Sequence, residues 1–222
     1  MALEDYKDIV GTSAAISTVG QMLAGVLICK DIYKRKSSQN IDPMPFIGGM
    51  GMSVLVLQYA LILKDFAMIN VNVVGFILNV LYTSFYYSYC PTKSKLLSTL
   101  AKTAALVAIF IGYAQMEDES KIEFRFGIIV TIVMFLLLAS PLIHLGEIFK
   151  TKSTEMLSFP IIFMATIVTF QWLLYGLIID NSFIVFQNAV GFTLSASELL
   201  LFVIFPSTPA KIASSKDIKK DN

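Results

Sequence analysis

The sequence predicts an all-α membrane protein with seven transmembrane helices, arranged as two parallel three-helix repeats joined by a linker helix (3+1+3). Composition is the first observation, because 56% of the 222 residues are hydrophobic and the mean hydropathy of +0.72 exceeds what a soluble domain needs to fill one core. The second is that apolar runs of about 17–25 residues, long enough to cross a bilayer as helices, occur repeatedly. We place these spans at 9–29, 44–63, 67–89, 97–115, 126–147, 157–179 and 183–205.

The third observation is an internal repeat with an offset of 116 residues. The stretch Asn72-Val73-Val74-Gly75-Phe76 returns without a gap as Asn188-Ala189-Val190-Gly191-Phe192, and Tyr59 returns as Tyr175. Such self-similarity indicates an architecture built from two copies of one unit. A three-helix unit that starts on one side of a membrane ends on the other, so a second copy in the same orientation needs one extra crossing. We therefore expect a first repeat at 1–92, a linker helix at 93–122, a second repeat at 123–206 and a cytosolic tail at 207–222.

Local signals support each span in chain order. Glycines at 11, 20 and 25 suit the first span for close packing between helices in a membrane, and two prolines open the second. The third span carries Asn72 and ends in an aromatic cluster at 82–89, which we interpret as a belt at the membrane interface. The fourth span has no counterpart in the repeat, and the last three repeat the first three.

The distribution of basic residues predicts the orientation. Thirteen of the 17 Lys and Arg residues lie on the side of the C-terminal tail, including those at 30–36 and 150–152. Because cytosolic loops carry an excess of Lys and Arg, we expect the N-terminus outside and the C-terminus in the cytosol. The tail ends in Lys219-Lys220-Asp221-Asn222, which resembles a di-lysine retrieval signal. The expected location is the plasma membrane, with a pool in the Golgi or ER.

Residues for catalysis or metal binding do not form a recognisable pattern in the sequence. There is one His, there are two Cys, and no carboxylate pair lies within a span. We therefore expect no enzyme activity, no cofactor, no metal site and no nucleic-acid partner. Ionisable groups at the membrane centre would indicate proton relays or ion sites, whereas His144, Glu147 and Glu198 lie near the ends of their predicted helices.

Neutral amides are the main polar groups inside the spans. An unpaired amide in hydrocarbon costs several kcal/mol, so each must face a helix or a water-filled cavity. For Gln58, Asn79 and Gln171 we expect hydrogen bonds between helices. Asn72 and Asn188 occupy equivalent positions in the two repeats, so we expect both to face one cavity on the shared axis. An amide pair offers donors and acceptors without charge, which suits a neutral polyhydroxylated solute.

Trp172 is the only tryptophan, and it lies at mid-span rather than at an interface. Two interpretations stay open: the indole packs in the core, or it forms a flat platform against a sugar ring. Its counterpart in the first repeat is the smaller Val56.

Proline and glycine indicate where the helices can bend. Pro141 interrupts the fifth span, Pro45 enters the second, Pro160 enters the sixth, and Gly25 holds the position in the first span that is equivalent to Pro141. Each weakens the local hydrogen-bond ladder. Static kinks are one interpretation, but the clustering of these residues toward the cytosolic ends of the helices favours an inner gate.

These motifs together resemble those of the SWEET sugar transporters, and the animal members in particular. The resemblance covers residues 9–205 and rests on Lys-Ser-Ser at 36–38, Lys-Thr-Lys-Ser-Thr at 150–154, Ala-Ser-Pro-Leu at 139–142, Trp-Leu-Leu-Tyr-Gly at 172–176 and the two Asn-x-Val-Gly segments. It implies facilitated, bidirectional movement of mono- or disaccharides by alternating access.

The resemblance also implies roles for individual residues. Asn72 and Asn188 would hydrogen-bond the sugar, Trp172 would stack on it, and Val56 would form the facing wall. Tyr59 and Asn181 would lie near the outer gate. The four-proline inner gate of plant members is incomplete here: Pro45 and Pro141 match it, Gly25 replaces one proline, and Pro160 is displaced by two residues from Ser158.

Two other functions are alternatives to a sugar uniporter. A seven-helix receptor fits the number of spans but does not predict a three-helix repeat. A PQ-loop-type carrier of another small solute would be expected to carry Pro-Gln dipeptides or charge inside the membrane, and the sequence has neither. The expected partners are a small neutral sugar and the lipid bilayer, and assembly into a homo-oligomer stays open.

Overall fold

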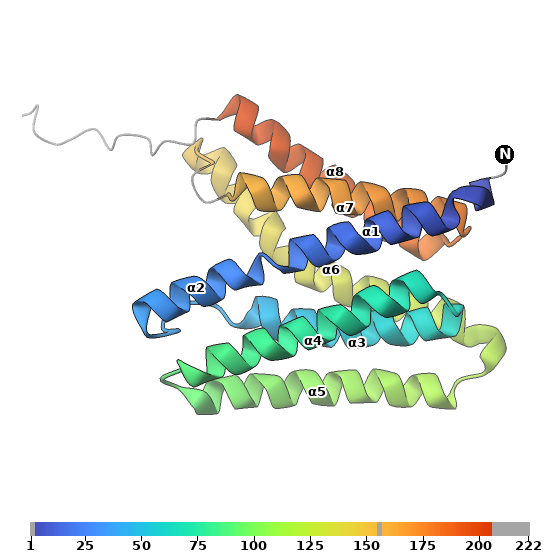
Figure 1. The fold of residues 1–222 in the computed structure, drawn as a ribbon, viewed down its shortest axis with the longest axis horizontal. Coiled ribbons are helices and arrows are strands. Elements are labelled where there is room, and N and C mark those ends of the chain that lie inside the picture. The colour runs from blue at the N-terminus through green and yellow to red at the C-terminus, as the bar shows by residue number, and fades with distance from the viewer. Residues whose placement is uncertain (1–2, 155–156, 206–222) are drawn as a thin grey trace, which may run out of the picture.

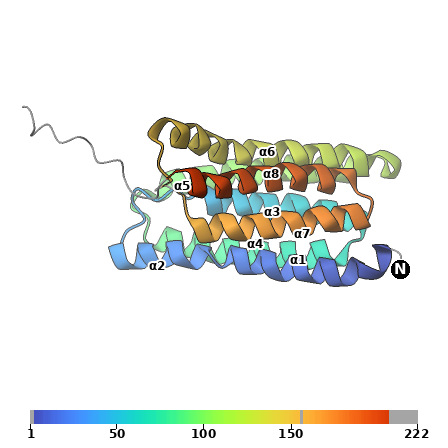
Figure 2. The same ribbon diagram turned by 90° about the horizontal axis from the view of Figure 1, so that it is seen from above.

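The computed structural model describes residues 3–154 and 157–205, except for the side chains of 3–4 and 139–151. This part of the chain is all-helical, and its long helices run along one common direction (Figures 1 and 2). The elements are η1 (Leu3–Tyr6), α1 (Lys7–Met22), α2 (Gly25–Arg35), α3 (Met44–Leu63), α4 (Phe66–Ser88), α5 (Lys93–Met116), α6 (Glu119–Thr151), α7 (Phe159–Ile178) and α8 (Ser182–Ile204).

The helices confirm the seven predicted spans. With α1 and α2 taken together, 6 stretches among the described residues are long and apolar enough to cross a membrane. The seventh span is α6, a helix of 33 residues. It begins seven residues before the predicted span at 126–147, because its first two turns are polar and extend beyond the apolar run on which the prediction rested.

The packing follows the 3+1+3 pattern. In the first half, α4 lies between α1 and α3, and in the second half α8 lies between α6 and α7. The halves meet where α1 packs against α7 and where α3 packs against α6 (Figure 1). These two contacts are equivalent under the repeat, so the halves are related by a pseudo-two-fold axis along the helices. The linker helix α5 lies outside this arrangement, against α3.

The first span is broken between α1 and α2. Residues 23 and 24 form a turn, and α2 begins at Gly25. The hydroxyl of Tyr82 on α4 donates to the carbonyl of Met22 at 3.3 Å, which satisfies a group that the break removes from the helical ladder. A Cβ atom at Gly25 would lie 2.5 Å from the Tyr82 ring. The break therefore packs against α4 only because residue 25 lacks a side chain.

The same turn joins α3 to α4 and α7 to α8. Lys64 and Asp180 follow the first helix of each pair and lie in the left-handed region, with φ of 55° and 52°. Asp65 and Asn181 then cap the next helix, because their side-chain oxygens accept the backbone N–H of Met68 and Ile184 at 2.9 Å and 3.0 Å. Such caps satisfy N–H groups that have no partner within the helix. Both turns lie at the end of the bundle that holds the N-terminus, which we call the N-terminal end.

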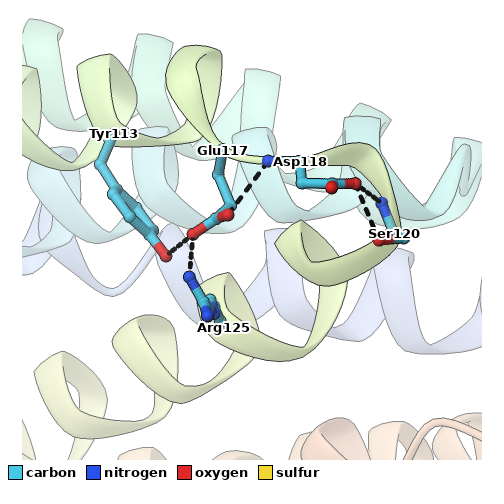
Figure 3. A network of polar contacts seen from close by, with 5 residues as sticks. All are labelled: Tyr113, Glu117, Asp118, Ser120 and Arg125. Atoms are coloured by element: carbon cyan, nitrogen blue, oxygen red, sulfur yellow. Dashed lines mark hydrogen bonds and ion pairs between the residues drawn. The ribbon is translucent and has the colours of Figure 1, made fainter.

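A polar network fixes the linker helix at this end (Figure 3). The Tyr113 hydroxyl donates to the Glu117 carboxylate, which also pairs with Arg125 on α6. The hydrogen bond from Tyr113, then that from Arg125 and the backbone N–H of Asp118, lower the pKa of Glu117 to about 2. Asp118 in turn accepts the backbone N–H and the hydroxyl of Ser120. The network joins the end of α5 to the beginning of α6.

Candidate functional site

A cavity of about 170 Å³ lies at the centre of the bundle, between the halves. The four residues predicted to bind sugar, Asn72, Asn188, Trp172 and Val56, all line it. They come from α4, α8, α7 and α3, so both repeats contribute. The remaining lining residues are Thr18, Met22, Met68, Val71, Ile184 and Gln187.

The Asn72 and Asn188 side chains are held in the same way. The Nδ2 of Asn72 donates to the carbonyl of Met68 at 2.8 Å, and that of Asn188 donates to the carbonyl of Ile184 at 2.9 Å. Each bond runs to the residue four positions earlier in the same helix, and it occupies only one of the two N–H groups. Each Oδ1 has no hydrogen-bond partner among the described residues, and both side chains are half-buried. Each amide therefore keeps one acceptor and one donor for a solute in the cavity.

Trp172 joins the cavity to the core. Its Nε1 donates to the Thr18 hydroxyl on α1 at 2.8 Å, and its ring meets that of Tyr175 edge-on at a centroid distance of 5.4 Å. Because the indole N–H is satisfied by the other half of the protein, the ring is held in place. Trp172 thus belongs both to the packed core and to the cavity wall, and its role as a platform for a sugar ring stays a prediction.

Two reciprocal contacts close the bundle at the N-terminal end. The Nδ2 of Asn181 donates to the Tyr59 hydroxyl at 2.9 Å, and the Tyr175 hydroxyl donates to Asp65 Oδ2 at 2.5 Å. The offset of 116 relates Tyr59 to Tyr175 and Asp65 to Asn181. In each contact, a tyrosine of one half therefore binds the helix cap of the other half. Both tyrosines are only 1% exposed, so these contacts form a sealed layer.

Asp65 was not among the residues singled out from the sequence. It is 4% exposed and lies 3.8 Å from Lys7 Nζ, so the layer contains one buried carboxylate with a basic neighbour. The repeat offset could have identified it as the counterpart of Asn181. Sequence reasoning also missed Gln187, whose Nε2 donates to the Thr131 hydroxyl at 2.6 Å. Its counterpart is Val71, so the repeat carried no signal for it.

A second cavity of about 480 Å³ extends from the central one toward the opposite end. Met22 and Asn72 line both cavities. Gly25, Pro45 and Ile161 line the far part of the second one. The bundle is thus sealed at its N-terminal end, and its internal space continues toward the other end.

The predicted hinge residues do not all interrupt helices. Pro45 and Pro160 stand in the first turns of α3 and α7, where the missing N–H would have no helical partner in any case. In this position they do not interrupt the helical hydrogen bonds, contrary to our expectation, and the inner gate stays a prediction. Gly25 lies at an observed break. Pro141 falls within α6, but its side chain is outside the described residues.

Of the three predicted hydrogen bonds between helices, that of Gln171 is found, and those of Gln58 and Asn79 are not found among the described residues. The Nε2 of Gln171 donates to the Ser13 hydroxyl on α1 at 2.7 Å, as expected. Asn79 instead donates to the carbonyl of Gly75 in its own helix at 2.8 Å. A side chain that can reach the preceding turn satisfies its donor locally, and the sequence pattern could not separate the two cases.

Comparisons with known proteins bear on this site. Residues 8–94 and 124–210 each match the family described as sugar efflux transporters for intercellular exchange. The sugar transporter SWEET1 of Drosophila pseudoobscura pseudoobscura is 33% identical over 205 residues, which cover 90% of this chain and 89% of that protein. Human sugar transporter SWEET1 is 26% identical over 197 residues, covering 87% and 89%.

A solved structure of a eukaryotic SWEET transporter has the same fold. It superposes with a TM-score of 0.85 at 22% identity, covering 93% of this chain and 99% of that one. The family match extends over most of the chain, and one relative exceeds 30% identity along nearly its whole length. The chain belongs to the SWEET family of sugar transporters.

Proposed function

We propose that the protein is a facilitative, bidirectional transporter that moves mono- or disaccharides across a membrane by alternating access. The observation that carries this proposal is the amide pair. Asn72 and Asn188 stand at equivalent positions of the two halves and line one central cavity. Each amide keeps one donor and one acceptor that are not used in hydrogen bonds within the protein. Neutral donors and acceptors beside an indole suit a solute with many hydroxyl groups and apolar ring faces.

The orientation follows from the basic residues. The N-terminal end faces outside and the opposite end faces the cytosol, in line with the excess of Lys and Arg there. The described form is then closed to the outside. Opening it requires the two halves to separate at the Tyr59–Asn181 and Tyr175–Asp65 contacts, which run between the halves. Sugar would bind from outside once these contacts break.

Transport without ion coupling is supported by the chemistry of the central cavity. The ten described residues that line it include no Asp, Glu, Lys, Arg or His, and charge within a membrane is the usual mark of a proton or sodium pathway. The sugar gradient alone would then set the direction of flux. Because the central cavity would open to each side of the membrane alternately, sugar could move in either direction.

Reconstitution into proteoliposomes tests the proposed function. The wild-type protein should equilibrate one or more members of a labelled panel of mono- and disaccharides, and it should show exchange with unlabelled sugar across the membrane. A protonophore or a sodium gradient should leave the final internal concentration unchanged. Accumulation above the external concentration would contradict the uniport mechanism, and failure of every sugar to move would contradict sugar transport.

For location we propose the plasma membrane with an intracellular pool. The motivating feature is the Lys219-Lys220 pair near the end of the chain, outside the described residues. Replacing both lysines by Ser should raise the fraction of protein at the cell surface, measured by surface biotinylation. An unchanged distribution would exclude retrieval by this pair. Assembly into a homo-oligomer can be measured on the same preparation by cross-linking.

A further inference from the structure

The cavity on the cytosolic side of the central site has its own polar wall in the first repeat. Gln21, Ser53, Asn72 and Asn79 contribute polar side chains to it. Ser53 is 5% exposed, yet neither its hydroxyl nor the Asn79 Oδ1 has a hydrogen-bond partner among the described residues. Both groups line the cavity, so they can form hydrogen bonds with water or with a solute there.

Asn79 repeats the geometry of Asn72. Each donates its Nδ2 to the carbonyl four residues earlier, at 2.8 Å in both cases. Seven residues, close to two helical turns, separate the two amides, which places them on one face of α4 about 10 Å apart along its axis. The face of α4 that lines the path therefore presents the same hydrogen-bonding group at two depths.

At the positions equivalent to Gly49 and Asn79, the second repeat has no amide side chain. Asn79 lies against Gly49 on α3, where an added Cβ would be 2.8 Å from the Asn79 Oδ1. The equivalent pair is Ser195 and Ala165, and the Ser195 hydroxyl donates to the carbonyl of Phe192 in its own helix at 3.2 Å. The second repeat thus has Ala and Ser at the positions where the first repeat has Gly49 and Asn79. Compared with the second repeat, the first repeat has a glycine in place of alanine on α3 and a larger polar side chain in place of serine on α4.

The neighbouring hydroxyl differs between the repeats in the same way. Thr169, the counterpart of Ser53, donates to the carbonyl of Ala165 at 2.7 Å, so its hydrogen bond is made within the helix. Ser53 makes no such bond and lines the cavity. At this depth the first repeat leaves its polar groups available, whereas the second repeat satisfies the equivalent ones internally.

We propose that Asn79 and Ser53 form a second binding station for the transported solute, a neutral polyhydroxylated molecule, on the cytosolic side of the Asn72–Asn188 site. This inference rests on the proposed sugar transport. Solute that leaves the central cavity past Met22 and Asn72 would exchange hydrogen bonds with these groups before it reaches the cytosol. The station belongs to one repeat only, so it makes the two directions of transport unequal in apparent affinity.

The test replaces residues of the first repeat by those at the equivalent positions of the second repeat. The double variant Gly49→Ala/Asn79→Ser places the Ala–Ser pair at α3–α4 and removes the free amide. In proteoliposomes of known orientation, the half-saturating sugar concentration on the cytosolic side should rise about 5-fold or more, as expected for the loss of one neutral hydrogen bond. The half-saturating concentration on the outer side should change less than about 2-fold.

Two further variants make the result decisive. Ser53→Ala removes the second group of the station without added volume and should produce the same one-sided change, which keeps the test valid if the double variant folds poorly. Ser84→Ala is the control, because Ser84 is exposed on α4, the helix of Asn79, and donates to the Val80 carbonyl. It should leave both concentrations unchanged.

The outcomes separate this inference from the proposed function. If wild-type protein transports sugar and the variants alter neither side, or both sides equally, these groups bind only water and the station is excluded. If the wild-type protein transports no sugar, the proposed function itself fails. A one-sided change in Ser53→Ala or in the double variant, with normal thermal stability, supports the station.

Discussion

Asp65 and Asn181 have nearly the same shape and make the same two contacts, but only one of them carries a charge. Each caps a helix and accepts or donates a hydrogen bond with the tyrosine of the opposite half. A hydrogen bond to a charged group contributes about 1.5–3 kcal/mol, against about 0.5–1.5 kcal/mol for a neutral pair. The two contacts that close the N-terminal end are therefore unequal in strength, although the repeat makes them equivalent in position.

Removing one hydroxyl at a time should reveal this inequality. Tyr175→Phe should shift the equilibrium toward the outward-open form by about 10- to 150-fold, and Tyr59→Phe by about 2- to 12-fold. The measurement is the rate at which a membrane-impermeant maleimide, added outside, labels Val71→Cys in the central cavity. Cys29 and Cys90 are first replaced by Ser to remove background. Equal effects, or a larger effect of Tyr59→Phe, would show that the carboxylate contributes nothing extra to the closure.

At the scale of single elements, the break between α1 and α2 depends on Gly25. In Gly25→Ala, the new Cβ would lie 2.5 Å from the Tyr82 ring, so the ring or α2 must move, at a cost of about 1–3 kcal/mol. We expect a lower melting temperature in detergent and slower transport. Gly20→Ala is the matched control, because no described residue lies within 4 Å of its Cβ position and alanine favours the helix by about 0.5–1 kcal/mol. A Gly25→Ala variant as stable as Gly20→Ala would refute the packing argument.

The connection between α5 and α6 should give the protein an acid-sensitive stability. The pKa of Glu117 is lowered to about 2, first by the hydrogen bond from Tyr113, and lies near 4 in an unfolded chain. A depressed pKa stabilises the fold above the unfolded value, and this stabilisation is lost as the pH falls from about 4 to about 2. Thermal unfolding across this range should show a smaller pH dependence in Glu117→Gln than in the wild type.

The exposed neighbour Glu119 supplies the control for that experiment. Glu119→Gln changes the net charge by the same amount, one residue past the Glu117–Asp118 pair, and should retain the wild-type profile of melting temperature against pH. An identical profile in Glu117→Gln would mean that the Tyr113 and Arg125 contacts do not stabilise the fold.

The helices could be predicted from the sequence more completely than their contacts. Long apolar runs report burial in lipid directly, so the seven spans and the 3+1+3 order followed from composition and the repeat. The partner of a polar side chain depends on geometry that such patterns do not contain. We expect Asn79 to bond another helix, yet it donates to the carbonyl of Gly75 in its own helix. Pro45 and Pro160 stand in the first turns of α3 and α7, because each helix starts one residue before its proline.

The candidate site was predictable to the extent that the repeat encodes it. Equivalent positions face a common axis, which placed Asn72 and Asn188 at one cavity. Asp65 was missed because its role appears only when the offset is applied to helix caps as well as to mid-span residues. The roles of Thr18 and Gln187 could not be predicted, because they depend on contacts with Trp172 and Thr131 that break the symmetry.

At the scale of the whole molecule, the two halves enclose a continuous internal space, made of the central cavity and the second cavity, that is closed at the N-terminal end. The sealed layer and most of the central cavity are built from equivalent residues of the two repeats, whereas the second cavity is lined mainly by the first repeat. Alternating access requires the halves to separate at one end while they approach at the other. The contacts of α1 with α7 and of α3 with α6 are the surfaces on which this movement would occur.

The central claim is that the amide pair binds the transported sugar, and the alanine variants of that pair test it most directly. Asn72→Ala and Asn188→Ala each remove up to about 1–3 kcal/mol of hydrogen bonding to the sugar, a loss of about 5- to 150-fold in affinity. Truncation leaves no buried group of another helix unpaired, because each amide bonds only its own helix. Sugar uptake, abundance and thermal stability are measured on the same preparations. If Asn72 and Asn188 bind the sugar, both variants should lose uptake while their abundance and stability stay near normal. Normal uptake in either variant, or loss of the folded protein in both, would contradict sugar binding by this pair.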